Sequence, residues 1–312
     1  MSDPAAAFEA RLRAILEERY HHRHPFNRRM HAGALTRDEI RAWVKSRYYY
    51  QTRIPIKDSA IVEKSSDAGF RRSWSERIHD HRGRRPGEGG LARWLDLAEA
   101  VGLDRAEVAS LRDISPGVRR ACDAYVAFVE SHDLLESVAS SLTELAAAEI
   151  MKVRIAAFET HYPWVDARGL RYFRDRTVQA RRDAEQGMRF VLRHARGAAD
   201  RERCAAALER KCEILWSLLD AVEALQRRPR LSKHAQPRFD DAGGESLVVL
   251  SERAVRVNPS GREILELCDG GRTAFELAAE LRRRHPDAAD VETTAYAFLD
   301  AMERLGVVEG RP

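Results

Sequence analysis

The chain has 312 residues, of which 44% are hydrophobic, 33% charged and 7% aromatic. This balance, with only 18 glycines and 11 prolines, excludes disordered, collagen-like and low-complexity proteins and leaves a globular protein of one large or two smaller domains. The formal net charge is only +4, yet 47 of the 53 basic residues are arginines. Because guanidinium groups bind carboxylates through two parallel hydrogen bonds, this ratio indicates either compositional bias or carboxylate recognition.

The sequence contains no feature of an exported or membrane protein. Residues 1–20 lack a basic segment followed by an apolar one, and no stretch approaches eighteen consecutive apolar residues. The four cysteines form no CxxC pair, so we predict buried free thiols and neither a zinc site nor a redox dithiol: Cys122, Cys204, Cys212 and Cys268. We therefore expect a cytoplasmic protein with no membrane partner.

Residues 6 to about 226 predict a bundle of roughly seven helices, because apolar residues recur at helical spacing. Turn signals interrupt the pattern at HPFN (24–27), RGRRPGEGG (82–90), ISPGV (114–118) and HYPWVDARG (161–169). The clearest helices are expected over 35–54, 71–81, 116–131, 134–161, 170–195 and 201–226. Thr36 and Glu39 form a capping box at the start of the first of these, and 134–161 is expected to be one long, buried, uninterrupted helix.

The pattern changes after residue 226. Residues 226–246 are polar and broken by Pro229, Pro237, Gly243 and Gly244, as in a linker or the start of a new unit. Residues 246–258 predict a β-hairpin that turns around Ser251, Glu252 and Arg253. Three short amphipathic helices are expected to follow, over 260–273, 274–286 and 291–310. Together these elements predict a small second domain.

Three of the predicted helices carry polar pairs at i,i+4 spacing, namely Arg47 with Gln51, Arg77 with His81, and Tyr172 with Arg176. Each pair projects from one helix face, so the three helices can converge on one polar pocket. Any single pair, taken alone, is more typical of a solvated face.

The predicted helix 134–161 adds a further pair of charges. Glu144 and Arg154 lie ten positions apart, close to three turns, among small and apolar neighbours. Such a pair must face either a partner or a cavity.

Many motifs in order carry a family resemblance. RYYYQTRIPIKDSAI, RIHDHRG, EGGLARWLDLAEAVGL, SSLTEL, HYPW, YFRDRTVQARRDAEQG and KCEILWSLLDA together resemble the PqqC family of pyrroloquinoline-quinone synthases over residues 8–226. RLSKHAQPRFDDAGGESLVVLSERAVRVNPSGREILELCDGGRT and the helices behind it resemble PqqD, the small peptide carrier of the same pathway. The chain is thus similar to PqqC/PqqD fusions, with expected domains 1–228 and 229–312.

The resemblance implies a fold and a reaction. The fold is an all-α, heme-oxygenase-like seven-helix bundle, followed by a small α+β domain, a hairpin plus three helices, that is winged-helix-like. The reaction closes the last ring of a polycarboxylate quinoline precursor and oxidises it with molecular oxygen to pyrroloquinoline quinone (PQQ), releasing hydrogen peroxide. The family needs neither a metal nor an organic cofactor and binds PQQ as product.

The family's substrate-enclosing residues fall on thirteen positions that keep the family's residue type: Tyr20, His21, Arg47, Gln51, Lys57, Arg77, His81, Tyr125, Glu144, Arg154, Tyr172, Arg176 and Lys211. We expect Arg47, Arg77, Arg154 and Lys211 to bind carboxylates, and Tyr20, His21, Gln51, Lys57 and Tyr125 to enclose the substrate.

The remaining four of these positions are expected to act in catalysis. His81 is the expected general base, and Arg176 is expected to stabilise negative charge that develops on reduced oxygen. Tyr172 is expected to donate a hydrogen bond and relay protons, and Glu144 to orient a cation or take a second proton.

Metal dependence is the alternative that related di-iron oxidases raise. Those enzymes carry an HxxxDxxH pattern on the late helix, where this sequence has Tyr172, Arg176 and Gln179. A cation at the second position repels iron, and His81 with Glu144 makes too few ligands. We therefore expect no metal.

The sequence departs from the family pattern at two places. Met151 stands where many PqqC proteins have a histidine, so the role of that histidine cannot be carried over to this chain. The basic run Arg82–Arg85 replaces a common acidic HDG-type run, and it adds positive charge near the proposed site.

For the C-terminal domain the resemblance implies binding of the precursor peptide PqqA and its presentation to the radical enzyme PqqE. The edge of the predicted hairpin suits an extended peptide. A winged-helix DNA-binding domain is the alternative, given the basic RRRH at 282–285. For the bundle, the alternatives are a product-binding scaffold and an oxidase of a different substrate. We expect a small polycarboxylate substrate, no nucleic acid, and a homodimer, as the bundle's family suggests.

Overall fold

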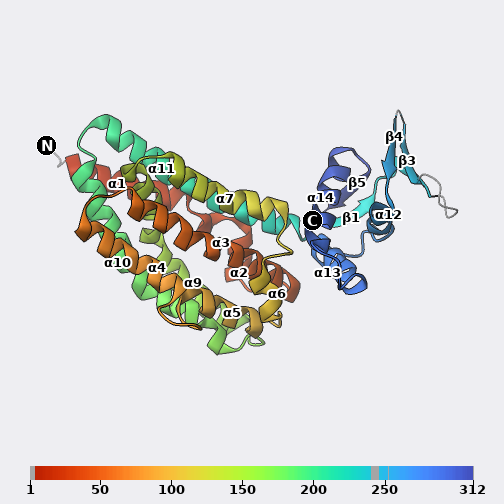
Figure 1. The fold of residues 1–312 in the computed structure, drawn as a ribbon, viewed down its shortest axis with the longest axis horizontal. Coiled ribbons are helices and arrows are strands. Elements are labelled where there is room, and N and C mark those ends of the chain that lie inside the picture. The colour runs from red at the N-terminus through yellow and green to blue at the C-terminus, as the bar shows by residue number, and fades with distance from the viewer. Residues whose placement is uncertain (1–3, 240–245, 252, 312) are drawn as a thin grey trace. The chain divides into compact units, whose positions relative to one another are not determined.

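The computed structural model describes residues 4–239, 246–251 and 253–311. They form two compact units, one of Met1–Ser110 with Arg119–Asp220 and the other of Leu111–Val118 with Ala221–Pro312 (Figure 1). The second unit thus begins before the predicted start at residue 229 and includes a short loop from far upstream. Thr293 explains part of this, because its hydroxyl donates to the backbone carbonyls of Arg112 and Ile114.

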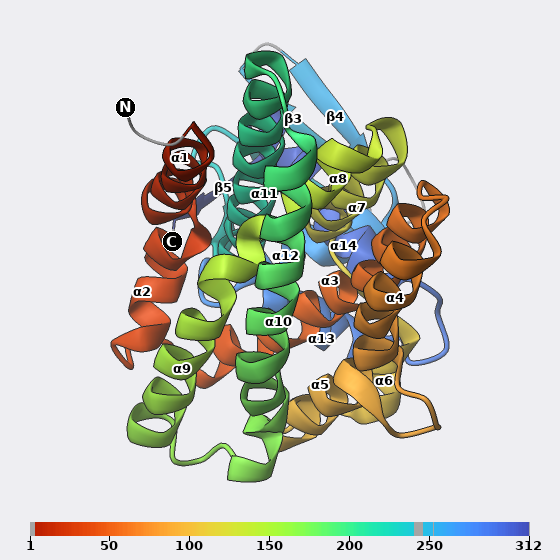
Figure 2. The same ribbon diagram turned by 90° about the vertical axis from the view of Figure 1, so that its left-hand side faces the viewer.

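The first unit is built from helices, as predicted. The α-helical segments are α1 (Pro4–Arg19), α2 (Pro25–His31), α3 (Arg37–Glu63), α4 (Ala68–Arg82), α5 (Gly89–Ala100), α6 (Arg105–Ser110), α7 (Pro116–Ser131), α8 (Leu134–Ser140), α9 (Glu144–His161), α10 (Arg171–His194) and α11 (Ala198–Ala224). Short 3-10 turns are η1 (His21–Arg23), η2 (Ser141–Thr143) and η3 (Ala167–Leu170). Helices α9 and α10 run beside each other, α10 in the centre of Figure 2 and α9 to its left.

Two sequence predictions about these helices are wrong. HPFN begins helix α2 rather than forming a turn, because Pro25 occupies its first turn and the His24 ring accepts a hydrogen bond from the Phe26 backbone N–H at 3.1 Å. The expected helix 134–161 is broken at η2. There the hydroxyls of Ser140 and Ser141 both hydrogen-bond to the Ser137 carbonyl, an interaction that competes with the regular helix.

Helix α3 begins with the predicted capping box, since Thr36 and Glu39 each bond to the other's backbone N–H. Its buried face meets an aromatic cluster. Trp43 on α3 lies 5.4 Å from the ring centre of Trp94 on α5 and stacks on Phe173 of α10 at 6.3 Å. These rings fix α3, α5 and α10 against one another, and removal of one of them costs about 3–5 kcal/mol in such cores.

The second unit contains the predicted hairpin and three helices. Strands β3 (Ser246–Leu250) and β4 (Arg253–Val257) are antiparallel, and β2 (Gln236–Arg238) joins them in a sheet of order β2-β3-β4. Strands β1 (Arg228–Leu231) and β5 (Val308–Arg311) pair separately, and the sequence did not predict β1, β2 or β5. The helices are α12 (Pro259–Glu266), α13 (Ala274–Arg284) and α14 (Val291–Arg304). Of the predicted turn, Glu252 lies outside the described residues.

None of the helices in the described ranges combines the length and the apolarity needed to cross a bilayer.

Candidate active site

The thirteen predicted residues come from η1 and its flank, α3, α4, α7, α9, α10 and α11. Twelve of them are buried, and Glu144 is half-buried. So many polar side chains inside a helical bundle are costly unless each has a partner or a ligand. The contacts of each group therefore decide what the site can do.

The three i,i+4 pairs do bring α3, α4 and α10 together. The Tyr172 hydroxyl donates to Gln51 Oε1 at 2.8 Å, which links α10 to α3. Burial, together with the nearby Arg176, lowers the pKa of His81 on α4. The predicted convergence on one polar region is thus confirmed in the structure.

The His81 ring has a defined tautomer. Its Nδ1 lies 3.1 Å from the carbonyl oxygen of Arg77, and a carbonyl only accepts, so Nδ1 carries the proton. Because the lowered pKa keeps the ring neutral near pH 7, Nε2 then holds a free lone pair. This is the form of histidine that accepts a proton from a substrate.

Three of the six cations in the site have carboxylate partners, and we call Lys57, Arg77 and Arg176 the paired cations. Arg176 donates to Glu144 Oε2 and to Asp183 Oδ2, the latter at 3.2 Å. Arg77 Nε lies 3.7 Å from Asp183 Oδ1.

Lys57 is the third paired cation. Its Nζ lies 2.7 Å from Asp58 Oδ1, and the coulombic attraction of Asp58 raises the pKa of Lys57 although burial lowers it. The amine also donates to Ser141 Oγ at 3.1 Å, and that hydroxyl is 3.2 Å from the Tyr125 hydroxyl. The break at η2 thus places Ser141 between Lys57 and Tyr125.

The other three, Arg47, Arg154 and Lys211, form no ion pair with any carboxylate in the described part of the chain, and we call them the unpaired cations. Their neighbours are neutral. The Arg47 guanidinium lies 4.2 Å from the Tyr50 ring centre, and Lys211 Nζ lies 3.3 Å from the Tyr125 ring centre and donates to the Tyr50 hydroxyl at 2.8 Å.

Arg154 is the least satisfied of the unpaired cations. It is 2% exposed and donates to Asn27 Oδ1 at 3.3 Å, and its Nε has no hydrogen-bond partner among the described residues. Burial and Arg47 lower the pKa of Arg154, although a guanidinium stays charged at neutral pH. A buried donor of this kind needs an acceptor from outside the chain.

His21 and Tyr20 lie beside the unpaired cations. Burial, with Arg47 and Arg154, lowers the pKa of His21 well below its usual value, so its ring is neutral. Asn27 Nδ2 donates to His21 Nδ1 at 2.8 Å, which leaves the proton on Nε2. Burial raises the pKa of Tyr20, so Tyr20 and His21 are both neutral beside these cations.

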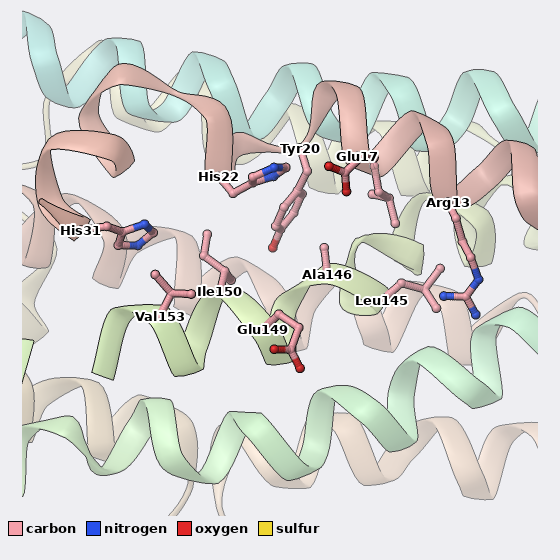
Figure 3. Close-up of a pocket in the computed structure, with 11 residues that line it drawn as sticks. Arg13, Glu17, Tyr20, His22, His31, Leu145, Ala146, Glu149, Ile150 and Val153 are labelled. Atoms are coloured by element: carbon pink, nitrogen blue, oxygen red, sulfur yellow. The ribbon is translucent and has the colours of Figure 1, made fainter. Parts of the chain in front are cut away.

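Two cavities of the first unit reach residues of the site. One, of about 450 Å³, lies between α1, α2 and α9 and is mostly apolar, and Tyr20 reaches into it toward Ala146 and Ile150 (Figure 3). The other, of about 220 Å³, lies between α4, α5 and α10, and Tyr172 and Arg176 form part of its wall. Gly90 of α5 packs closely there, since a Cβ at this position would lie 3.2 Å from Tyr172 Cε2.

The two departures from the family pattern have separate surroundings. Met151 Sδ lies 4.0 Å from Arg154 Nη1, so the thioether is a weak acceptor for an unpaired cation. In the basic loop, Arg84 lies 2.9 Å from Glu76 and pairs with it at the surface. Part of the extra positive charge of the loop is therefore neutralised locally.

Sequence reasoning missed the partners of the paired cations, Asp58 and Asp183, and the hydroxyl of Ser141. Asp183 follows Arg176 by seven residues, a spacing that puts both on one helix face and was available as a signal. Asp58 lies next to Lys57, and it also accepts from Trp74 Nε1 at 2.9 Å.

At the di-iron ligand positions, the structure places an arginine against the carboxylate. The Arg176 guanidinium bonds directly to Glu144, one of the two candidate ligands, while the other, His81, hydrogen-bonds through Nδ1 to a backbone carbonyl. A cation in contact with a ligand carboxylate competes with iron for it.

Residues 9–221 match the family model described as TENA/THI-4/PQQC family. The chain belongs to this family. Residues 246–308 match the model of coenzyme PQQ synthesis protein D (PqqD). The predicted resemblance to fusions of PqqC with PqqD is therefore confirmed.

Curated relatives of the family match the first unit closely. The pyrroloquinoline-quinone synthase of Rhizobium meliloti (strain 1021) is 50% identical over 216 residues, which are 69% of this chain and 84% of that protein. The synthase of Ectopseudomonas mendocina (strain ymp) is 48% identical over 227 residues, 72% of this chain and 90% of that protein.

Solved structures confirm the heme-oxygenase-like fold of the family. A TenA homologue from P. horikoshii OT3 superposes with a TM-score of 0.57 at 12% identity, covering 69% of this chain and 97% of that one. A domain from Shewanella denitrificans OS217, described as having a heme oxygenase-like fold, superposes with a TM-score of 0.56 at 13% identity, covering 70% of this chain and 89% of that one.

Proposed function

We propose that this chain is a pyrroloquinoline-quinone synthase with an appended peptide carrier. It closes the last ring of a quinoline precursor that bears several carboxylates, and oxidises it with molecular oxygen to PQQ with release of hydrogen peroxide. The observation that carries this proposal is the group of three unpaired cations, Arg47, Arg154 and Lys211, buried in the same helical bundle as the neutral base His81. The curated synthases to which the first unit is similar support it.

Substrate binding falls to the unpaired cations, whereas Arg77, which the sequence also led us to expect as a carboxylate-binding residue, is already held by Asp183. None of the three has a carboxylate partner among the described residues. A substrate carboxylate would supply the counter-charge that each buried cation needs in surroundings of low dielectric constant. Arginine forms two parallel hydrogen bonds to a carboxylate, so Arg47 and Arg154 also fix the orientation of the ring system. Neutral His21 adds an Nε2 donor on the same side.

Oxidation falls to His81, Tyr172 and Arg176. In each two-electron step the substrate loses two electrons and two protons, and oxygen gains them to become hydrogen peroxide. His81 Nε2 accepts a proton from the substrate, and Tyr172 relays protons and donates a hydrogen bond. Arg176, held by Glu144, stabilises negative charge on partly reduced oxygen.

We propose that this reaction needs no metal and no organic cofactor. The support is the ion pair between Arg176 and Glu144. Because the guanidinium already binds this carboxylate and carries a positive charge, it disfavours a metal cation at the same place. Electrons then pass from the substrate to oxygen directly, and PQQ binds as product only.

Oxygen consumption by the purified, metal-stripped chain tests the proposed function. With the quinoline precursor, we expect oxygen uptake, peroxide release and the product's absorption spectrum. Protein that neither binds PQQ nor consumes oxygen with the precursor overturns the proposal. A shift of the PQQ spectrum without precursor conversion would instead identify a product-binding scaffold, and oxygen uptake only with another acid would identify a different substrate.

For the second unit we propose binding of the precursor peptide PqqA and its presentation to the radical enzyme PqqE. The match to PqqD and the sheet of order β2-β3-β4, which ends in β2 and β4 in the described residues, support strand addition. Labelled peptide should stay bound as salt rises from low to moderate concentration. A steep loss, or tight binding to duplex DNA, would favour the DNA-binding alternative.

We also propose that the chain works as a homodimer in the cytoplasm, following its family. Light scattering on the purified protein tests the dimer, and a mass of one chain would reject it. Cell fractionation tests the location.

A further inference from the structure

Asp183 is a buried carboxylate that the proposed mechanism does not use. It lies on α10, is 2% exposed, and contacts two of the paired cations. Its Oδ2 accepts from Arg176 Nη1 at 3.2 Å, and its Oδ1 lies 3.7 Å from Arg77 Nε. Its backbone oxygen also accepts from Arg77 Nη2 at 2.6 Å. One residue thus touches the guanidinium groups of two helices.

We propose that Asp183 is a positioning residue of the oxidation chemistry, which holds Arg176 and Arg77 in fixed orientations and keeps Arg176 from turning toward a substrate carboxylate. This inference rests on the proposed function and adds a residue to it. The substrate's carboxylates are left to the unpaired cations.

The geometry around Arg176 explains how one carboxylate does this. Glu144 binds Nη2 of the guanidinium, and Asp183 binds Nη1. A planar group anchored on two of its nitrogens cannot rotate about its long axis, so its exposed edge keeps one direction. A donor whose direction is fixed before reaction stabilises developing charge more than a mobile one.

Arg77 is fixed in the same manner. Its guanidinium lies 3.6 Å from the Trp74 ring centre, and Asp183 contributes both a carboxylate and a backbone carbonyl oxygen to the guanidinium nitrogens. The backbone carbonyl of Arg77 in turn accepts from His81 Nδ1. Asp183 therefore contacts the same residue whose backbone carbonyl sets the tautomer of the base.

Asp183 is ionised in this setting. Although its burial raises the pKa, the guanidinium groups of Arg77 and Arg176 bring the pKa of Asp183 below its usual value. A third arginine, Arg182, reaches Asp183 Oδ1 at 2.7 Å, but it is 48% exposed and also pairs with Asp80. Arg182 thus supplies a control that touches the same carboxylate without touching the site.

The competing view is that Asp183 only neutralises buried charge. Its loss would then destabilise the fold and change substrate binding and oxidation together. A positioning role instead separates the two, because product binding depends on Arg47, Arg154 and Lys211.

The test compares Asp183→Asn with wild type and with Arg182→Gln, in the full chain. We measure PQQ affinity by absorption titration and the single-turnover oxidation rate of the bound precursor. For Asp183→Asn we expect the rate to fall about 10- to 100-fold with the PQQ dissociation constant changed less than about 3-fold. Arg182→Gln should change both by less than about 3-fold. A wild-type rate, or an equal loss of rate and affinity, overturns the proposal.

A double-variant cycle shows whether Asp183 acts through Arg176. Arg176→Lys alone should slow oxidation, and adding Asp183→Asn should slow it by less than Asp183→Asn does in wild type, because only the contact with Arg77 is left to lose. Multiplication of the two losses would overturn the proposal.

Two further measurements keep the test decisive. Should Asp183→Asn not fold, Asp183→Glu keeps the charge but moves it along the side chain, and it should lower the rate while it retains PQQ affinity. Wild-type oxidation by that variant would overturn the proposal. Should wild type not oxidise the precursor, the proposed function fails, and a crystal structure of the Asp183 variant then decides. Unmoved Arg77 and Arg176 guanidinium groups would overturn the positioning role.

Discussion

The paired cations and the unpaired cations of the bundle differ in what the chain provides for them. Lys57, Arg77 and Arg176 each meet a carboxylate of the same chain, whereas Arg47, Arg154 and Lys211 meet aromatic rings, an amide and a hydroxyl. A buried cation without a counter-charge weakens the fold, so its retention indicates a ligand that brings the counter-charge. The contrast indicates that the unpaired cations bind the substrate's carboxylates, and that the oxidation takes place beside the paired cations.

Among the tests of this contrast, His81→Ala has the largest expected effect, a loss of oxidation rate without a loss of PQQ affinity. The base lies with the paired cations, so its removal should lower the oxidation rate by about 10²- to 10⁴-fold while PQQ affinity is retained. Because the pKa of His81 is lowered, the acid limb of kcat/KM in wild type should fall below pH 6.5, the usual value for histidine, and should vanish in the variant.

His79→Ala is the matched control for this change, on the same helix and with a side chain 41% exposed. It should leave rate and affinity near wild type. A loss of PQQ affinity in His81→Ala as large as its loss of rate would contradict the division between the two sides.

Lys57→Met and Lys211→Met form the next comparison, since both remove a buried amine of similar shape. Lys57→Met leaves Asp58, which is 1% exposed, without its cation, so the free energy of unfolding should fall by about 3–5 kcal/mol. Lys211→Met removes a buried amine that has no carboxylate partner among the described residues, and stability should stay equal or rise. Urea unfolding at pH 7 measures both, and equal losses would refute the distinction.

Arg154→Met is expected to weaken PQQ binding by about 10- to 100-fold, the usual value of a charged hydrogen bond, without lowering stability. The substitution removes the buried Nε that has no hydrogen-bond partner among the described residues. This gain in stability offsets the loss of the hydrogen bond to Asn27. Lys152→Met on the same helix is the control, because that amine is 46% exposed. Calorimetric titration with PQQ gives the affinities, and an unchanged Arg154→Met would exclude it from binding.

The smallest expected effect is a proton taken up when PQQ binds. Burial, with Lys57 and Arg47 nearby, lowers the pKa of Lys211 well below its usual value, and a bound carboxylate raises it again. Affinity should therefore be greatest below the pKa of Lys211 in the free protein and decline as pH rises through it. Titration in buffers of different ionisation enthalpy should show up to about one proton per site. The dependence on the buffer should disappear in Lys211→Met.

The sequence predicted the side of the site that lies on regular helices. Pairs four residues apart, such as Arg47 with Gln51, share a face whatever surrounds the helix, so their convergence needed no knowledge of packing. Asp183 was not predicted, because the run RRDAEQ has the composition of a solvated surface. Only the packing of α4 against α10 turns that carboxylate inward, onto Arg77.

Features that depend on contacts between distant parts of the chain could not be predicted from the sequence either. Ser141 reaches Lys57 only because the expected helix 134–161 breaks there, and three neighbouring serines gave no decisive signal for a break. Strands β1 and β5 escaped prediction for a similar reason, since Arg228 pairs with Arg311 across most of the second unit. Short strands that pair with distant partners leave little periodicity in their own residues.

Gly90 has a consequence for comparing this chain with others. At this position any side chain begins 3.2 Å from the Tyr172 ring, so a larger residue forces the tyrosine or α5 to move. The residue at this position in a relative therefore indicates whether its tyrosine must shift from the place in which Tyr172 holds Gln51. Sorting family members by this residue would identify the chains in which the contact between α5 and the tyrosine must adjust, before any of them is purified.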